Sequence, residues 1–361
     1  AHSTDIGGNP VNLRFAAVWK AQNTATVGTI RVAWPSGIVN LHLIQSTDDI
    51  INTSDTHTPM TGTITVNGKV YNYADVTIAN GSYFSFSGYV AGPGGVGQDL
   101  SLWYRADNGV ETDASKKVTA WNNSTANDVK LTMSSAAGYI PYNDQTTYTK
   151  TWNFNPTLSF DGTNNYLRNN TTAYLNTAGS VHYIAVARLN GTASSYNSLF
   201  AISGNDDGFF LFPQSGLVYP MPSIGNGFGA AAAGPGSANR FGIYSAILPK
   251  TGAPANQRGF YNGLEKIYTS PYPRTGGNYV LPTTGAYIGA DGTTADNPNG
   301  DIAEVILYHE PAGGDMNNAN LARIHSYLAI KNGITLDQST PQHYINPASH
   351  LVWNPVNNQA Y

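Results

Sequence analysis

Short runs in which apolar and polar residues alternate recur along this chain, and turn-forming residues separate them. Alternation with a period of two gives a strand one buried face and one wet face, as in an antiparallel sheet. In the first 90 residues such runs lie at residues 11–15, 29–34, 39–43, 63–66, 69–71 and 83–86. Asn67 and Gly68 separate two of them, and this dipeptide favours a tight hairpin because both residues tolerate positive φ. Residues 1–90 are therefore predicted to form a small antiparallel β-sandwich.

A glycine-rich segment at residues 91–97 follows, and its composition predicts a linker. Strand-like runs then resume, and residues 98–335 are predicted to form a larger unit of antiparallel sheets. The last stretch, residues 336–361, has too few residues for a domain and is interpreted as a tail.

One helix is predicted at the end of the larger unit. Leu321, Ile324, Leu328 and Ile330 fall there roughly on a single helical face. Asp315 is the predicted N-cap, and Gly333 stands where a helix often ends in a left-handed glycine.

Charge and cysteine content exclude several classes of function. Only 11% of the 361 residues are charged and the net charge is −4, so no basic surface for nucleic acid or anionic lipid is predicted. The chain has no cysteine, which excludes disulfides, thiol catalysis and zinc–thiolate sites. No stretch approaches the ~20 apolar residues of a transmembrane helix, so no membrane span is predicted.

The motifs of residues 98–335 carry a family resemblance. They are LWYRAD at 102–107, VTAWN at 118–122, LSFDG at 158–162, AYIGA at 286–290 and GDIAEVILY at 300–308. In this order they resemble the concanavalin-A-like, laminin-G-like lectin domain of large bacterial surface proteins of the adhesin type. The resemblance implies an all-β chain whose larger unit is a jelly-roll sandwich with one C-terminal helix. It also implies an extracellular location at the bacterial cell surface.

The two ends of the chain carry a second resemblance. In such surface proteins the lectin unit is often followed by an uncharacterised β domain. Residues 333–354 resemble the beginning of that domain, and residues 18–86 resemble its end. The resemblance implies copies of the chain that join head to tail, with the tail as a donor segment. The alternative is one repeat of a longer polypeptide, whose tail folds back on its own chain. Leu351, Val352 and Trp353 are the predicted anchors of that contact.

Catalysis is not predicted. Retaining glycoside hydrolysis needs two carboxylates about 5 Å apart, and no predicted strand carries such a pair. The glutamates are Glu111, Glu265, Glu304 and Glu310. Glu304 is interpreted as a strand-edge residue that hydrogen-bonds a turn, and His182 as a packed core residue. No Gly-x-Ser-x-Gly nucleophile motif occurs in the sequence.

Calcium is the one cofactor that the sequence suggests. Asp291, Asp296, Asn299 and Asp301 crowd one glycine-rich loop, and hard cations prefer such oxygen ligands. A second, weaker cluster lies at residues 205–207. The alternative is that these side chains cap their own backbone in Asx-turns.

A glycan is the other expected ligand. Tyr219, Tyr268 and Tyr272 lie in loop-like stretches and could serve as aromatic platforms, although packing or a protein contact is the alternative. Trp103, Trp121 and Trp152 are expected in the core. The preferred function is a structural or adhesive module of an extracellular fibre. The alternatives are a lectin that binds surface glycans and, third, a carbohydrate-active enzyme.

Overall fold

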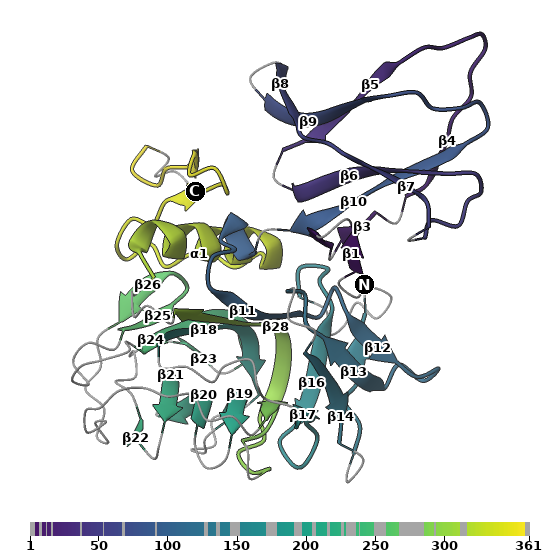
Figure 1. Ribbon diagram of the computed structural model, residues 1–361. Coiled ribbons are helices and arrows are strands. Elements are labelled where there is room, and N and C mark those ends of the chain that lie inside the picture. The colour runs from purple at the N-terminus through teal and green to yellow at the C-terminus, as the bar shows by residue number, and fades with distance from the viewer. Residues whose placement is uncertain are drawn as a thin grey trace. The chain divides into compact units, whose positions relative to one another are not determined.

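The computed structural model contains two compact units, Ala1–Ala91 and Gly92–Tyr361, called here the N-terminal and the C-terminal unit (Figure 1). The structure describes all residues except 1–3, 7–8, 12, 16, 37, 53, 67–68, 91, 126–128, 135–137, 145–151, 171–178, 191–196, 204–206, 215–216, 225–226, 229–235, 238, 249–257, 267–284, 292–293, 311–315 and 358–361.

The N-terminal unit is a small antiparallel sandwich, as predicted. One sheet has the order β5 (Ile30–Pro35), β9 (Lys69–Val76) and β8 (Gly62–Val66). The other has the order β3 (Leu13–Arg14), β10 (Tyr83–Val90), β6 (Ile38–Ser46) and β7 (Thr56–Pro59), with β4 (Trp19–Lys20) also paired to β10. Strands β1 (Thr4–Ile6) and β2 (Asn9–Val11) form a separate pair. Side chains from both sheets, such as Leu43, Phe86 and Val76, share one core.

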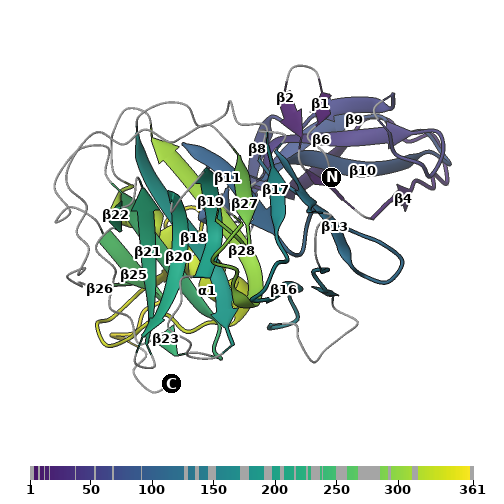
Figure 2. The same ribbon diagram turned by 90° about the horizontal axis from the view of Figure 1, so that it is seen from below.

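The C-terminal unit is a larger sandwich of an eight-stranded and a ten-stranded sheet (Figure 2). The eight-stranded sheet has the order β15 (Tyr142–Asn143), β16 (Thr157–Asp161), β28 (Asn299–Glu310), β18 (Ser180–Leu189), β24 (Gly242–Leu248), β25 (Arg258–Tyr261) and β26 (Leu264–Lys266), and β11 (Leu100–Arg105) pairs with β28. The ten-stranded sheet has the order β12 (Val110–Thr112), β13 (Val118–Asn122), β14 (Lys130–Met133), β17 (Leu167–Asn169), β27 (Ala286–Ile288), β19 (Asn197–Ser203), β20 (Asp207–Gln214), β21 (Leu217–Ile224) and β22 (Gly227–Phe228), and β23 (Gly236–Ser237) pairs with β21.

Helix α1 (Asn318–Asn332) covers the outer face of the eight-stranded sheet (Figure 1). Its N-cap is Asn317, whose side chain accepts from the Asn320 amide; Asp315, the predicted N-cap, lies outside the described residues. The predicted Gly333 does end the helix, with φ 61°. No helix in the described part of the chain has the length and apolar character needed to cross a membrane.

The predicted linker is part of the C-terminal unit. Its residues Pro93–Gly95 form a short 3₁₀ turn, η1, and the carbonyls of Gly94 and Gly95 accept from the Arg323 guanidinium at 3.1 and 2.9 Å. A Cβ on Gly94 would lie 2.4 Å from the Arg323 carbonyl oxygen. The glycines therefore let this segment approach α1 closely. The composition of the segment had predicted a linker.

The tail packs on α1 of its own chain. Leu336 is buried, and the Ile345 amide donates to the Ser326 hydroxyl at 3.0 Å. Strands β29 (Tyr344–Ile345) and β30 (Leu351–Trp353) pair with each other. The tail therefore has packing partners within its own unit.

Candidate functional site

The four predicted calcium residues separate into two places. Asp291 is buried and its carboxylate accepts from the Ala295 amide at 2.7 Å, while Asp296 belongs to the same loop. Asn299 and Asp301 instead belong to β28 and line a pocket. In the described part of the chain no cluster of three or more His, Asp or Glu side chains could hold a metal. Calcium binding remains a prediction.

The predicted tyrosine platforms and the second acidic cluster have no described side chains. Tyr268 and Tyr272 lie outside the described residues, and so does the side chain of Tyr219, whose backbone pairs with Phe212. The second acidic cluster, residues 205–207, has no described side chains.

The predicted anchors lie in β30. Leu351 and Val352 are 54% and 57% exposed. Trp353 is half-buried, with its ring 5.5 Å from that of Tyr344.

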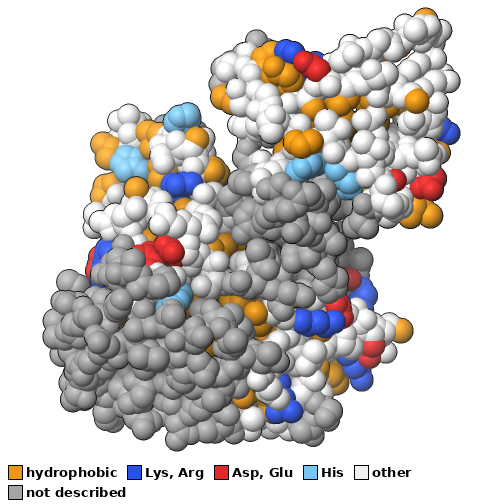
Figure 3. Space-filling view, viewed as in Figure 1, with side chains coloured by type: hydrophobic (Ala, Val, Ile, Leu, Met, Phe, Trp, Pro, Cys, Tyr) orange, Lys and Arg blue, Asp and Glu red, His pale blue; other side chains and the backbone are white. Residues whose placement is uncertain are grey.

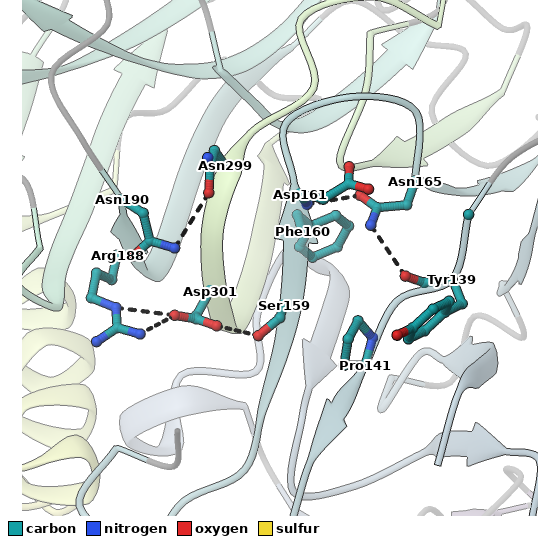
Figure 4. Close-up of a pocket in the computed structure, with 11 residues that line it drawn as sticks. Tyr139, Pro141, Ser159, Phe160, Asp161, Asn165, Arg188, Asn190, Asn299 and Asp301 are labelled. Carbon is teal, nitrogen blue, oxygen red and sulfur yellow. Dashed lines mark hydrogen bonds and ion pairs between the residues drawn. The ribbon is translucent and has the colours of Figure 1, made fainter. Parts of the chain in front are cut away.

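The pocket has a volume of about 380 Å³ and opens beside the ends of β16 and β28 (Figure 4). It is lined by Gly138, Tyr139, Pro141, Ser159, Phe160, Asp161, Asn165, Arg188, Asn190, Asn299 and Asp301. Most of these side chains are polar, and they come from three neighbouring strands and three loops.

Strand register creates the polar wall. Asp301 of β28 lies opposite Ser159 of β16 on one side and opposite Arg188 of β18 on the other. The buried Asp301 carboxylate accepts from the Ser159 hydroxyl and from Arg188, whose Nε lies 3.0 Å away. A second row is formed by Asp161 and Asn190, which flank Asn299. Arg188 is therefore held in place, and its charge is balanced, before any ligand binds.

A tight turn orients the second carboxylate. The Asp161 amide donates to the Asn165 side chain at 3.1 Å, and the Asp161 carboxylate accepts from the Thr163 amide at 2.9 Å. Gly162 has φ 78°, where a side chain would be strained, and this lets the chain reverse directly after β16. The Asp161 carboxylate thus caps the turn that follows it, as in an Asx-turn, and it also lines the pocket.

The aromatic wall is Tyr139, which was not identified from the sequence. It is 52% exposed, and its carbonyl accepts from the Asn165 amide group at 3.2 Å. The Lys117 ammonium lies 4.4 Å from the centre of its ring. In the sequence, Tyr139 follows Gly138 and lies two residues before Pro141. Glycine and proline near a tyrosine indicate a loop, and the same pattern identified the predicted platforms.

A second polar cluster is buried under α1. Glu304 is 1% exposed and lies within β28, with β11 and β18 on its two sides, so its interpretation as a strand-edge residue is wrong. Its carboxylate accepts from the Trp103 indole at 2.9 Å and pairs with Lys331 at 2.7 Å. His182 is a packed core residue, as predicted: it is 3% exposed and stacks on Tyr308.

Charged side chains form small separate groups on the face shown in Figure 3. Ion pairs among the described residues include Arg31–Asp75 and Lys130–Glu111. This surface agrees with the low charge content of the sequence.

Three findings relate the chain to known proteins. The model of a family described as "Domain of unknown function (DUF8202)" matches residues 320–361, which include most of α1 and the tail. No curated protein matches the chain.

Among solved structures, domain 4 of AbnA, a GH43 extracellular arabinanase from Geobacillus stearothermophilus, in complex with arabinotriose, is 16% identical. The match covers 63% of this chain and 98% of that domain, with a TM-score of 0.42. Trypanosoma rangeli sialidase in complex with sialic acid is 12% identical, over 76% of this chain and 45% of that one, with a TM-score of 0.40. The ligand-binding domain of botulinum neurotoxin serotype D in complex with N-acetylneuraminic acid is 12% identical, over 63% and 50%, with a TM-score of 0.38. At these scores the all-β assignment rests on the structure itself.

Proposed function

We propose that this protein is a glycan-binding module and that the pocket beside β16 and β28 holds the sugar. The observation that carries the proposal is the half-exposed ring of Tyr139 at the edge of a pocket lined by carboxylate, amide and guanidinium groups. Sugar rings present apolar C–H faces and hydroxyl rims, so an aromatic face beside polar side chains fits both surfaces.

The charges of the pocket favour a neutral sugar. Asp301 balances Arg188, so the guanidinium offers hydrogen bonds with little net attraction for an anion. Asp161 adds a carboxylate that accepts hydrogen bonds from hydroxyl groups and repels acidic sugars. We expect neutral pyranosides with adjacent hydroxyl groups to bind, and uronic and sialic acids to bind more weakly.

A glycan array followed by titration calorimetry tests the proposal. Tyr139→Ala is expected to weaken binding by about 10-fold or more, because truncation of a central aromatic anchor costs about 1.4 kcal/mol or more. Phe154→Ala is the matched control, since Phe154 is 71% exposed and does not line the pocket. Binding that survives both Tyr139→Ala and Asp161→Asn would place the glycan elsewhere on the chain.

The module is proposed to be non-catalytic. Of the two pocket carboxylates, Asp301 is engaged by Arg188 and Ser159, and this leaves Asp161 without the second carboxylate that hydrolysis needs. Assays with a broad set of polysaccharides should show no turnover. Turnover that disappears in Asp161→Asn would contradict this.

A second candidate function is assembly at a bacterial cell surface, with copies of the chain joined head to tail. The exposure of Leu351 and Val352 supports it, because a strand with two outward apolar side chains offers anchors to another chain. In the described part of the tail, β30 pairs only with β29, so its other edge can accept a strand. Electron microscopy of the full chain and of Leu351→Ser/Val352→Ser tests it, and fibres formed equally by both would exclude this edge.

A further inference from the structure

One lysine and two carboxylates meet under the last turn of α1, and none of them lines the pocket. The Lys331 Nζ lies 2.7 Å from Glu304 Oε1 and 3.0 Å from Asp107 Oδ1. Lys331 comes from α1, Glu304 from β28, and Asp107 from the turn that follows β11. Lys331, a nucleophile, thus contacts both a buried acid–base group and a second carboxyl group.

The eight-stranded sheet sets this geometry. Arg105 of β11 lies opposite Glu304 of β28, and Trp103 lies on the same face of β11, two residues earlier. The Trp103 indole donates to Glu304 Oε2 at 2.9 Å and thereby turns Oε1 toward Lys331. The Asn108 amide donates to the Arg105 carbonyl at 3.1 Å, and this turn carries Asp107.

Burial separates this cluster from an ordinary surface ion pair. The Glu304 side chain is 1% exposed and that of Lys331 15%, and the rings of Trp103 and Tyr327 pack together beside them at 6.1 Å. Charges buried in this way lose hydration that their mutual attraction only partly restores. Condensation of Lys331 with Asp107 would remove two of the three charges of this cluster.

We propose that Lys331 and Asp107 condense to an intramolecular isopeptide bond, with Glu304 as the catalytic acid–base. The Lys331 Nζ attacks Cγ of Asp107, so a C–N bond forms and one C–O bond breaks. Two of the three ammonium protons leave with the displaced oxygen as water, and the third stays on the new amide nitrogen. Glu304 carries protons from nitrogen to oxygen and ends unchanged. No oxidant, reductant or co-reactant is consumed.

Lys331 contacts both of the groups that this step uses. The Lys331 Nζ lies 3.0 Å from Asp107 Oδ1, which places the amine beside the carboxyl group that it would attack. Burial lowers the pKa of Lys331, but the Glu304 and Asp107 carboxylates raise it more, so its pKa lies above the ordinary value and the amine needs a base. Glu304 is that base at 2.7 Å. Arg105, with Nε 3.4 Å from Asp107 Oδ1, stabilises the oxygen on which negative charge develops.

The bond would join the beginning of the C-terminal unit to its end. Asp107 and Lys331 are 224 residues apart in the sequence. A cross-link between them constrains the unfolded chain over this whole span, as a disulfide closing a long loop does. It also ties α1 to the turn after β11, so a pull on the two ends of the unit would be borne by a covalent bond.

The intact mass of the purified, folded full chain tests the proposal directly. We expect the mass to be lower than that calculated from the sequence by one water molecule. Digestion should release a branched peptide that joins the segments containing Asp107 and Lys331. The Lys116–Asp144 pair, 2.5 Å apart and with a lysine side chain that is 46% exposed, is an internal control and should give only separate peptides.

Two variants identify the roles. Lys331→Arg keeps the positive charge and Glu304→Gln keeps the size of the side chain, and each should restore the full calculated mass. A wild-type chain of full mass with no branched peptide would overturn the proposal. It would also be overturned by a loss of water that persists in Lys331→Arg, because that loss would come from another reaction, such as cyclisation at an aspartate.

Discussion

Strand β18 of the C-terminal unit buries every residue except Arg188, whereas strand β5 of the N-terminal unit buries none of its six. β18 packs on the ten-stranded sheet through Tyr183, which stacks on Phe209 at 5.7 Å. Its other face lies under α1 and the residues before it, where His182 contacts Met316. β5 belongs to a three-stranded sheet with only one packed face. A strand covered on both sides loses the polar face that a strand covered on one side keeps.

The hydrophobic cores of the two units also differ in extent. The core of the C-terminal unit draws on strands of both large sheets. That of the N-terminal unit depends on a few rings, with Phe86 5.0 Å from Trp34 and 5.4 Å from Phe15. Small domains bury a smaller share of their surface and have less stability in reserve. The N-terminal unit should therefore be the weaker of the two.

The largest expected effect is the loss of one central ring from the weaker unit. Phe86 is 3% exposed, and Phe86→Ala should destabilise the N-terminal unit by about 3–5 kcal/mol. Calorimetry should show one transition lowered or lost while the second stays in place. If both transitions move together, the two units do not unfold independently and the comparison fails.

Acid should act mainly on the C-terminal unit. Burial lowers the pKa of His325 to about 4 from 6.5, and burial also lowers the pKa of His182. Between these two pH values the unfolded chain binds a proton at His325 that the folded unit does not. Stability should therefore fall by roughly 3 kcal/mol as the pH drops from 6.5 to 4, and His182, whose pKa burial also lowers, should add to this loss.

Denaturant unfolding across this pH range measures the effect. His325→Gln should flatten the dependence, since glutamine has no proton to gain. In the N-terminal unit, burial lowers the pKa of His57, but this group is only half-buried and its contribution should be smaller. A stability profile of the C-terminal unit that His325→Gln leaves unchanged would refute the assignment.

Calcium should affect only the unit that contains the Asp291 loop. Extracellular modules bind it with Kd of about 10⁻⁴ to 10⁻³ M, so ~10 mM calcium should stabilise this unit by about 1–3 kcal/mol. Asp296→Asn should reduce the effect, and it avoids the Arg188 pair that Asp301→Ala would break. Melting curves that respond to neither calcium nor chelator would remove calcium from the expected ligands.

The smallest effect concerns one strained turn. Trp152 and Asn155 exchange backbone hydrogen bonds of 3.0 and 2.8 Å, and Phe154 between them has φ 63°. Left-handed backbone is costly for a bulky residue, so Phe154→Gly should stabilise the C-terminal unit by about 1 kcal/mol. Phe154→Ala keeps the strained backbone and should not. Equal melting temperatures for the two variants would show that the turn stores no strain.

Local pattern alone predicted a good part of this molecule. Alternation located β5 and β6, because a strand with one wet face records its period in the sequence. The apolar spacing of Leu321, Ile324 and Leu328 and the glycine at 333 located α1, because helix faces and helix ends depend on neighbouring residues. Ile330, assigned to the same face, is instead 54% exposed. Trp103 and Trp121 are 1% and 0% exposed, as expected of core residues, while Trp152 is only half-buried.

The tertiary structure decided which side chains meet. Asp301 was predicted as a calcium ligand because it lies in an acidic stretch. In the structure its carboxylate accepts a hydrogen bond from Arg188, which is 113 residues away in the sequence. Glu304 was assigned to a strand edge, yet α1 brings Lys331 onto it. The sequence by itself determined strands, turns and one helix, because these follow from residues a few positions apart. Only the pairing and register of distant strands, and the docking of α1 on them, placed the polar groups in contact, and local alternation carries no record of that choice.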